Sequence, residues 1–70
     1  MKYAVVIERA GANYSAYVPD LPGCAATGDD VEEVEKNIKE AIQFHIEGMN
    51  EDGITAPVPS TMCEYIDPVN

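Results

Sequence analysis

The sequence predicts a small α+β domain with the element order β-β-β-α-β, in which one long helix packs on one face of a four-stranded sheet. Three observations support this prediction. Short segments near the N-terminus alternate apolar and polar residues, as half-buried strands do. A long segment beginning at residue 31 repeats apolar residues at every third or fourth position, as an amphipathic helix does. The 70 residues suffice for a single domain, which we assign to residues 1–70.

The first three strands follow from alternation and from the turns between them. Residues 2–9 form the first expected strand, with Tyr3, Val5 and Ile7 on one face. The segment AGAN at residues 10–13 supplies Gly and Asn, which favour a hairpin turn. Residues 14–18 form the second strand, which Pro19 ends because proline has no N–H for the ladder. Residues 24–28 form a short third strand of small residues.

The helix has a recognisable start and stop. Asp30 is the expected N-cap and Glu33 occupies the third helical position, so the pair resembles a capping box. We expect the helix to end near Gly53. Phe44 lies well off the apolar stripe, and an exposed phenylalanine there is a candidate contact for a partner. The stripe that faces the sheet consists of Val31, Val34, Ile38, Ala41, Ile42 and Met49.

A last strand is expected at residues 62–67, after a proline-containing extended connection, TAPVPS, at residues 55–60. Hairpins make the first three strands antiparallel, whereas a helical crossover makes the fourth parallel to the first. A right-handed crossover then gives the strand order 3-2-1-4. One helix covers only one face of such a sheet, and a chain this small has a thin core. We therefore expect a homo-dimer or tetramer.

The net charge of the chain indicates which class of partner it can bind. Thirteen acidic residues against four basic ones give a net charge of −9, which opposes nucleic acid and favours a basic protein partner. We expect no direct DNA binding by this chain.

No apolar run approaches the roughly 18 residues of a membrane span, and no signal-peptide pattern is visible, so we expect a cytoplasmic protein. One histidine and two distant cysteines match no metal-ligand spacing, and no cofactor is expected. Cys24 and Cys63 are expected to be reduced core residues.

The segment PDLPGC at residues 19–24 allows two interpretations. Pro19, Pro22 and Gly23 have the chemistry of a rigid turn, with Gly23 supplying a positive φ. Asp20 and Leu21 either belong to that turn as well or project from it to contact a partner, and the sequence leaves both alternatives open.

These segments together resemble the N-terminal domain of HicB-like antitoxins. In that family a strand ends in a PDLPGC turn, a GDT step caps the helix, and the helix carries the pattern EEA…NI…EAI…H.EG. Here PDLPGC matches in full, and Gly28-Asp29-Asp30 departs from GDT by one residue. The matching helix positions are Glu32, Glu33, Asn37, Ile38, Glu40, Ala41, Ile42, His45 and Gly48.

The resemblance implies a partial ribonuclease-H-like fold and the role of an antitoxin in a type II toxin–antitoxin system. Its partner would be a HicA-like toxin, a small basic protein that cleaves messenger RNA. The antitoxin would cover the toxin's RNA-binding face. The family usually carries a C-terminal DNA-binding domain, for which residues 1–70 contain no counterpart.

Two other classes of function stay open. A stand-alone oligomeric domain with a regulatory or ligand-binding role is the main alternative. A residual RNA-processing enzyme is the third, but the carboxylates are scattered and a ribonuclease-H site needs them gathered around metal ions. We therefore expect no catalytic residues.

Overall fold

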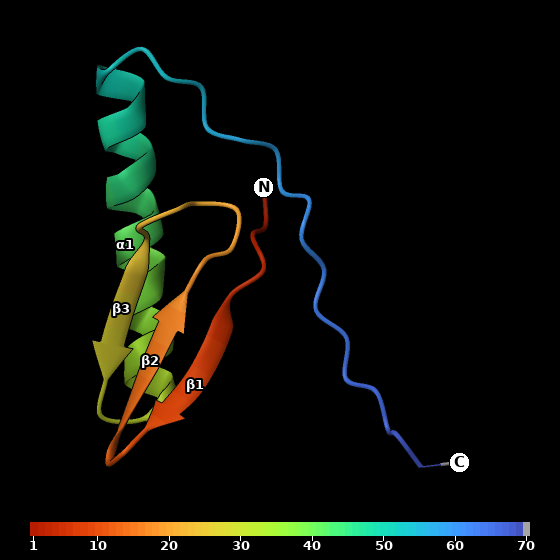
Figure 1. Ribbon diagram of the computed structural model, residues 1–70. Helices are drawn as coiled ribbons and strands as arrows, with labels where there is room; N and C mark the ends of the chain where they lie inside the picture. Colours follow the sequence, from red (N-terminus) through yellow and green to blue (C-terminus); the bar gives the residue numbers. More distant parts are fainter. Residues whose placement is uncertain (70) are drawn as a thin grey trace.

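The computed structural model describes residues 1–69 and contains a three-stranded antiparallel sheet with one helix across it (Figure 1). The strands are β1 (Val6–Ala10), β2 (Asn13–Tyr17) and β3 (Ala25–Gly28), and the helix is α1 (Val31–Glu51). The order β1-β2-β3 confirms the two expected hairpin connections. The α+β class and the antiparallel arrangement are therefore confirmed.

The β1–β2 hairpin has its last pair at Val6 and Tyr17. The first strand was expected from residue 2, but residues before Val6 have no partner strand because β2 ends at Tyr17 and the chain then turns at Pro19. Gly11 supplies the positive φ of 64° that the tight turn needs. The N-terminal segment is thus extended without belonging to the sheet ladder.

The start of α1 lies directly over the end of β3. A Cβ atom at Gly28 would lie 2.5 Å from the backbone nitrogen of Val34, so only glycine permits this approach. The side-chain amide of Asn37 donates a hydrogen bond of 2.8 Å to the carbonyl oxygen of Thr27. The helix is therefore fixed to the edge strand β3 both by close packing and by a polar contact.

Both ends of α1 are capped. The Asp30 carboxylate accepts a 2.7 Å bond from the Glu33 backbone N–H, which confirms the expected N-cap. The Glu33 carboxylate reaches back to the N–H of Asp29, at 3.4 Å, one residue earlier than in the usual capping box. At the other end Gly53 has a φ of 74°, and the N–H of Ile54 donates to the carbonyl of Met49. This is a Schellman motif.

The core lies between α1 and the sheet, and it extends into the loop after β2. Tyr3, Val5, Tyr14, Ala41 and Ile42 pack around its margin. Its buried members are Ala16, Val18, Leu21, Cys24, Val34 and Ile38.

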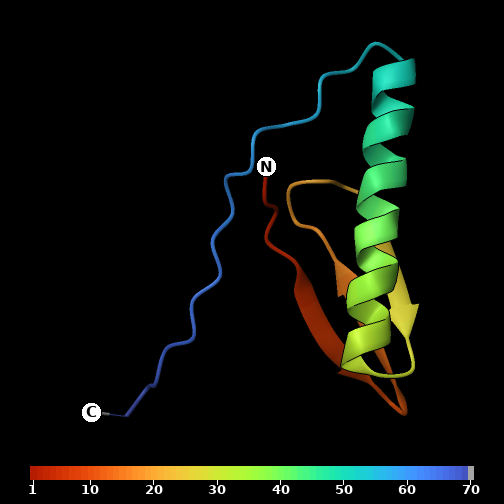
Figure 2. The same ribbon diagram turned by 180° about the vertical axis from the view of Figure 1, so that it is seen from behind.

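The fourth strand expected at residues 62–67 is absent from the sheet of residues 1–69, and the order 3-2-1-4 is not observed. After the linker at residues 54–61 the chain runs away from the body as an extended arm, visible in both views (Figures 1 and 2). Alternation and composition had suggested a strand, but a strand needs a neighbour, and no described segment pairs with this one. Cys63 lies on the arm and is exposed, so its expected place in the core was wrong, whereas Cys24 is buried as expected.

Within the described residues, no helix has the length and apolar character needed to cross a membrane.

Candidate partner-binding surface

The PDLPGC segment forms two consecutive β-turns. The N–H of Leu21 donates to the carbonyl of Val18 at 3.0 Å, and the N–H of Cys24 donates to the carbonyl of Leu21 at 3.0 Å. Each turn has a proline at its second position, where a fixed φ near −65° is favourable. Gly23 follows Pro22 with a φ of 85°, close to the value that a type II turn requires there. Pro19, Pro22 and Gly23 therefore have the structural role that their chemistry suggests.

Leu21 points inward from this double turn. Its side chain is 0% exposed and is one of the two largest fully buried side chains of the described chain. A partner cannot contact it unless the core opens, so its assignment as a candidate contact residue is corrected to a core residue. The physical reason is that the two turns fold the loop back over the sheet, so that the apolar residue between them closes the end of the core.

Asp20 binds a segment of its own chain. Its carboxylate accepts backbone N–H bonds from Ser60 at 2.9 Å and from Thr61 at 3.0 Å. It also accepts hydroxyl bonds from Ser60 at 3.2 Å and from Thr61 at 2.6 Å. We call this set the Asp20 clamp. Because both carboxylate oxygens are engaged, Asp20 fixes the start of the extended arm rather than projecting freely toward a partner.

The clamp changes the acidity of Asp20. The hydroxyl bond from Thr61, followed by the backbone bonds from Thr61 and Ser60, lowers the pKa of Asp20 from 3.8 to about 2. Hydrogen bonds to the charged form stabilise it, which is the direction observed. Asp20 is therefore a carboxylate at every pH near neutral, and the clamp is fully formed there.

A second contact joins the linker to the N-terminal segment. The Tyr3 hydroxyl donates a 2.6 Å hydrogen bond to the carbonyl of Pro57. Together with the Asp20 clamp it holds residues 57–61 beside the body of the domain. The sequence did not predict either contact. Tyr3 and Pro57 are 54 residues apart and Asp20 and Ser60 are 40 residues apart, and no local sequence pattern indicates a contact over such a separation.

Phe44 lies on the outer face of α1 and is 79% exposed, as its place off the apolar stripe suggests. Glu40 precedes it, and Glu47 and Glu51 follow it, at helical spacing, and all three are also exposed. We call these four residues the Phe44 stripe. An exposed aromatic side chain flanked by carboxylates provides an apolar anchor and a negative potential on one surface, which is suited to a basic protein.

The sheet face opposite the helix is only partly apolar. Register places Val6, Tyr17 and Ala25 side by side on it, with Tyr17 45% exposed. The next row consists of Glu8, Ser15 and Thr27, all polar. Apolar and polar rows therefore alternate on this face.

Residues 1–69 contain no group of three or more His, Cys, Asp or Glu side chains placed to hold a metal ion. Burial raises the pKa of the Cys24 thiol, which opposes formation of the reactive thiolate.

Comparison with protein families gives a match over almost the whole chain. The sequence model of the family described as HicB-like antitoxin of bacterial toxin–antitoxin system matches residues 3–69.

Individual relatives have been identified in phage, bacteria and archaea. An uncharacterised 14.9 kDa protein from the rep–hol intergenic region of Haemophilus phage HP1 is 45% identical over 67 residues, which cover 96% of this chain and 50% of the phage protein. A UPF0150 protein of Helicobacter pylori is 43% identical over 67% of this chain and 65% of its own length. A UPF0150 protein of Archaeoglobus fulgidus is 40% identical over 67% of this chain and 70% of its own. The chain thus spans half the length of its phage relative.

A solved structure described as the HicA3 and HicB3 toxin–antitoxin complex contains a chain of similar fold. The TM-score is 0.73 at 30% sequence identity, and the match covers 86% of this chain and 70% of the other.

Proposed function

The chain belongs to the HicB-like antitoxin family of bacterial toxin–antitoxin systems, and from this premise we propose that it binds and neutralises a small basic HicA-like toxin. The observation that carries the proposal is the similarity to a chain of the HicA3–HicB3 complex, at a TM-score of 0.73 and 30% identity. The acidic excess of this chain supports it independently, because a net charge of −9 attracts a basic partner.

The contact surface that we propose is the Phe44 stripe. Acidic side chains on the loop and sheet edge would be the simplest mimic of RNA phosphates, but Asp20 is occupied by the clamp and Leu21 is buried. The outer face of α1 combines the exposed ring of Phe44 with three carboxylates. Occlusion of an RNA-binding surface requires such carboxylates to pair with the lysines and arginines that would otherwise hold phosphate.

The two kinds of side chain have different roles in this mechanism. Carboxylates steer a basic protein toward the helix and therefore govern the association rate and its salt dependence. Phe44 is an anchor that loses water in the complex, so it governs dissociation. Neither role involves catalysis by this chain, which acts by covering its partner.

Growth rescue tests the proposal. The gene is co-expressed with a neighbouring reading frame that encodes a small basic HicA-like protein and whose product arrests growth when expressed alone. Wild type should restore growth, and Phe44→Ala and Glu40→Lys should restore it less. Glu8→Lys makes the same charge change on the opposite sheet face and is the matched control, which should rescue like wild type.

Absence of rescue by wild type, together with absence of co-purification with any neighbouring basic protein, would exclude the antitoxin role. The alternative is then a stand-alone oligomeric domain. A defect of equal size in Glu8→Lys would instead retain the antitoxin role and exclude the Phe44 stripe as its surface.

A further inference from the structure

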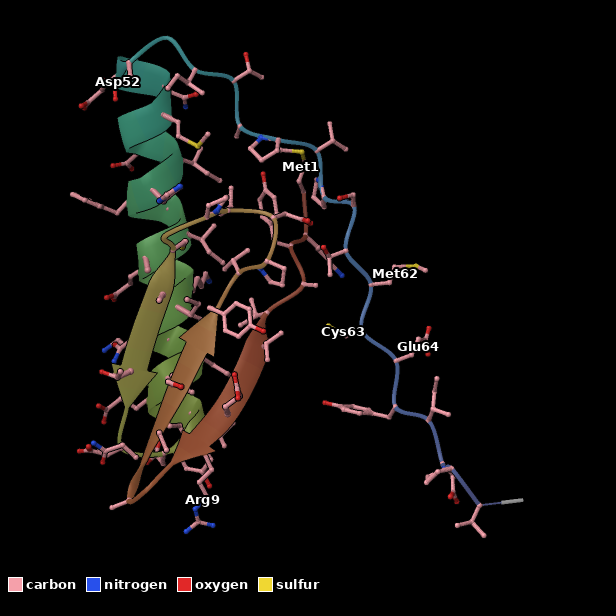
Figure 3. The ribbon with its side chains drawn as sticks, in the orientation of Figure 1. Met1, Arg9, Asp52, Met62, Cys63 and Glu64 are labelled. Carbon is pink, nitrogen blue, oxygen red and sulfur yellow. The ribbon has the colours of Figure 1, made fainter. Side chains whose placement is uncertain are left out.

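The extended arm, which we define as residues 62–69, is the most exposed part of the chain that carries apolar side chains. Met62 is 83% exposed and Ile66 is 82% exposed. Figure 3 shows Met62, Cys63 and Glu64 along this arm, at a distance from the sheet. Tyr65 and Val69 are exposed as well. An isolated domain gains nothing from holding such residues in water, whereas a strand that pairs with another chain requires them.

The start of the arm is fixed beside the body. The Asp20 clamp holds Ser60 and Thr61, and Tyr3 holds Pro57. From this point the arm runs away from β1 in both views (Figures 1 and 2). The arm therefore leaves the domain at a defined place and in a defined direction, which lowers the entropy that a partner must remove to bind it.

The same domain has an open site for a strand. Among the described residues β1 pairs only with β2, so its other edge retains unpaired backbone groups. Beside this edge a groove of about 450 Å³ opens between the N-terminal segment and α1. Its floor is apolar and its rim carries Glu35, Lys39 and Gln43. The apolar side chains come from Met1, Tyr3, Val5, Ile7, Ile38 and Ile42.

We propose that the arm of one copy of this chain adds to the free edge of β1 in a second copy, and that its apolar side chains fill the groove there. In an extended strand Met62, Glu64 and Ile66 share one face. Met62 and Ile66 then enter the apolar groove, and Glu64 between them lies on the side of Lys39. Backbone hydrogen bonds provide affinity, and the alternate side chains provide specificity.

The exchange is reciprocal, because each copy has one arm and one edge. Such an arrangement closes into a dimer with two-fold symmetry and leaves no free arm. It also supplies apolar burial that a single 70-residue chain lacks. A second copy fits better than the chain's own edge, since the arm already diverges from its own β1 beyond the clamp (Figure 2). This assembly does not depend on the proposed toxin partner.

Light scattering on wild type and three variants tests the exchange. Wild type should have twice the protomer mass of 7.6 kDa. Met62→Asp/Ile66→Asp places two carboxylates where the groove is apolar, and Ile7→Glu places one in the groove itself. Each variant alone should be monomeric or dimerise at least about tenfold more weakly. Val58→Asp changes an equally exposed residue that precedes the clamp, and it should remain dimeric.

Mixing two variants distinguishes an arm that pairs with β1 of a second copy from an arm that pairs with β1 of its own chain. The arm variant retains an intact groove and Ile7→Glu retains an intact arm, so a mixture should form a heterodimer through one exchanged arm. If circular dichroism shows that Ile7→Glu weakens the fold, Lys39→Glu on the groove rim is used in its place. A monomeric wild type, a dimeric arm variant or a mixture without heterodimer would each overturn the proposal. The first result would place the arm on its own β1.

Discussion

Asp20 and Leu21 are adjacent in the sequence and have opposite environments. Asp20 accepts four hydrogen bonds from a segment that follows about forty residues later, whereas Leu21 is 0% exposed in the core. The two β-turns around them produce this difference, since they direct one side chain toward the linker and the other toward the sheet. A single loop thereby joins the core to the start of the arm.

Leu21→Ala should destabilise the fold. Removing a fully buried leucine costs about 2–5 kcal/mol, which in a domain of this size lowers the melting temperature by at least about 10 °C. Phe44→Ala is the matched control, because the exposed ring should change the unfolding free energy by no more than about 0.5 kcal/mol. Thermal unfolding followed by circular dichroism measures both. Equal melting temperatures for Leu21→Ala and wild type would contradict the core assignment.

Asp20→Ala should release the start of the arm without unfolding the domain. The amides of Ser60 and Thr61 lose their acceptor, so their hydrogen exchange should accelerate, while exchange in α1 stays as in wild type. Asp67→Ala is the control, because the Asp67 carboxylate accepts only a local bond from the N–H of Val69. Unchanged exchange at Ser60 and Thr61 in Asp20→Ala would show that the clamp does not exist in solution.

The clamp also has a defined pH dependence. Its folded-state pKa of about 2 lies below the ordinary value of 3.8, so the stability that it contributes is complete above that value. It is lost as the pH falls from about 4 toward 2, as the carboxylate becomes protonated. The protection of the two amides, which is the intrinsic exchange rate at the same pH divided by their observed rate, should therefore fall in wild type over this interval and stay constant in Asp20→Ala.

At the scale of the elements, the packing of α1 on β3 depends on one glycine. Gly28→Ala introduces a methyl group 2.5 Å from the backbone nitrogen of Val34, and should cost about 1–3 kcal/mol in unfolding free energy. Gly48→Ala is the matched control within the helix, where a Cβ would meet no atom within 4 Å. It should stabilise the domain by about 0.5–1 kcal/mol, because alanine is the better helix former. Chemical denaturation gives both values, and a loss of stability in both variants would refute the close-approach argument.

The elements that could be predicted are those with local causes. Alternation in the first two strands, Asp30 as the N-cap and Gly53 after the last helical turn are all visible in a few neighbouring residues. Residues 62–67 have the composition of a strand as well, yet they pair with nothing in the described chain. Pairing depends on a neighbour, and the sequence does not state where that neighbour lies.

The candidate site was predictable only in part for the same reason. Phe44 was identified by its phase on the helix, which is a local property, and it is exposed. Asp20 and Leu21 were grouped as loop residues, although one is clamped by Ser60 and Thr61 and the other is buried. Turn residues are usually exposed, and only the three-dimensional arrangement separates these two.

At the scale of the whole molecule, charge and shape act together. In the two proposals made above, the contacts with a basic partner lie on the outer face of α1, and the contacts with a second copy involve the β1 edge, the groove and the arm. Both surfaces include residues of α1: Glu40 and Phe44 belong to the Phe44 stripe, whereas Lys39 and Gln43 line the groove. The two proposed interactions therefore use different side chains of the same helix. Loss of one interaction should therefore leave the other intact.

The most direct test of the proposed function is a calorimetric titration, at low and high salt, of the purified chain with a catalytically inactive form of a HicA-like toxin encoded beside its gene. We expect one toxin to bind per chain, with an affinity that falls as the salt concentration rises. Glu40→Lys should weaken binding by on the order of tenfold or more, and Glu8→Lys by much less. Absence of binding at both salt concentrations would contradict the proposal that this chain neutralises a HicA-like toxin.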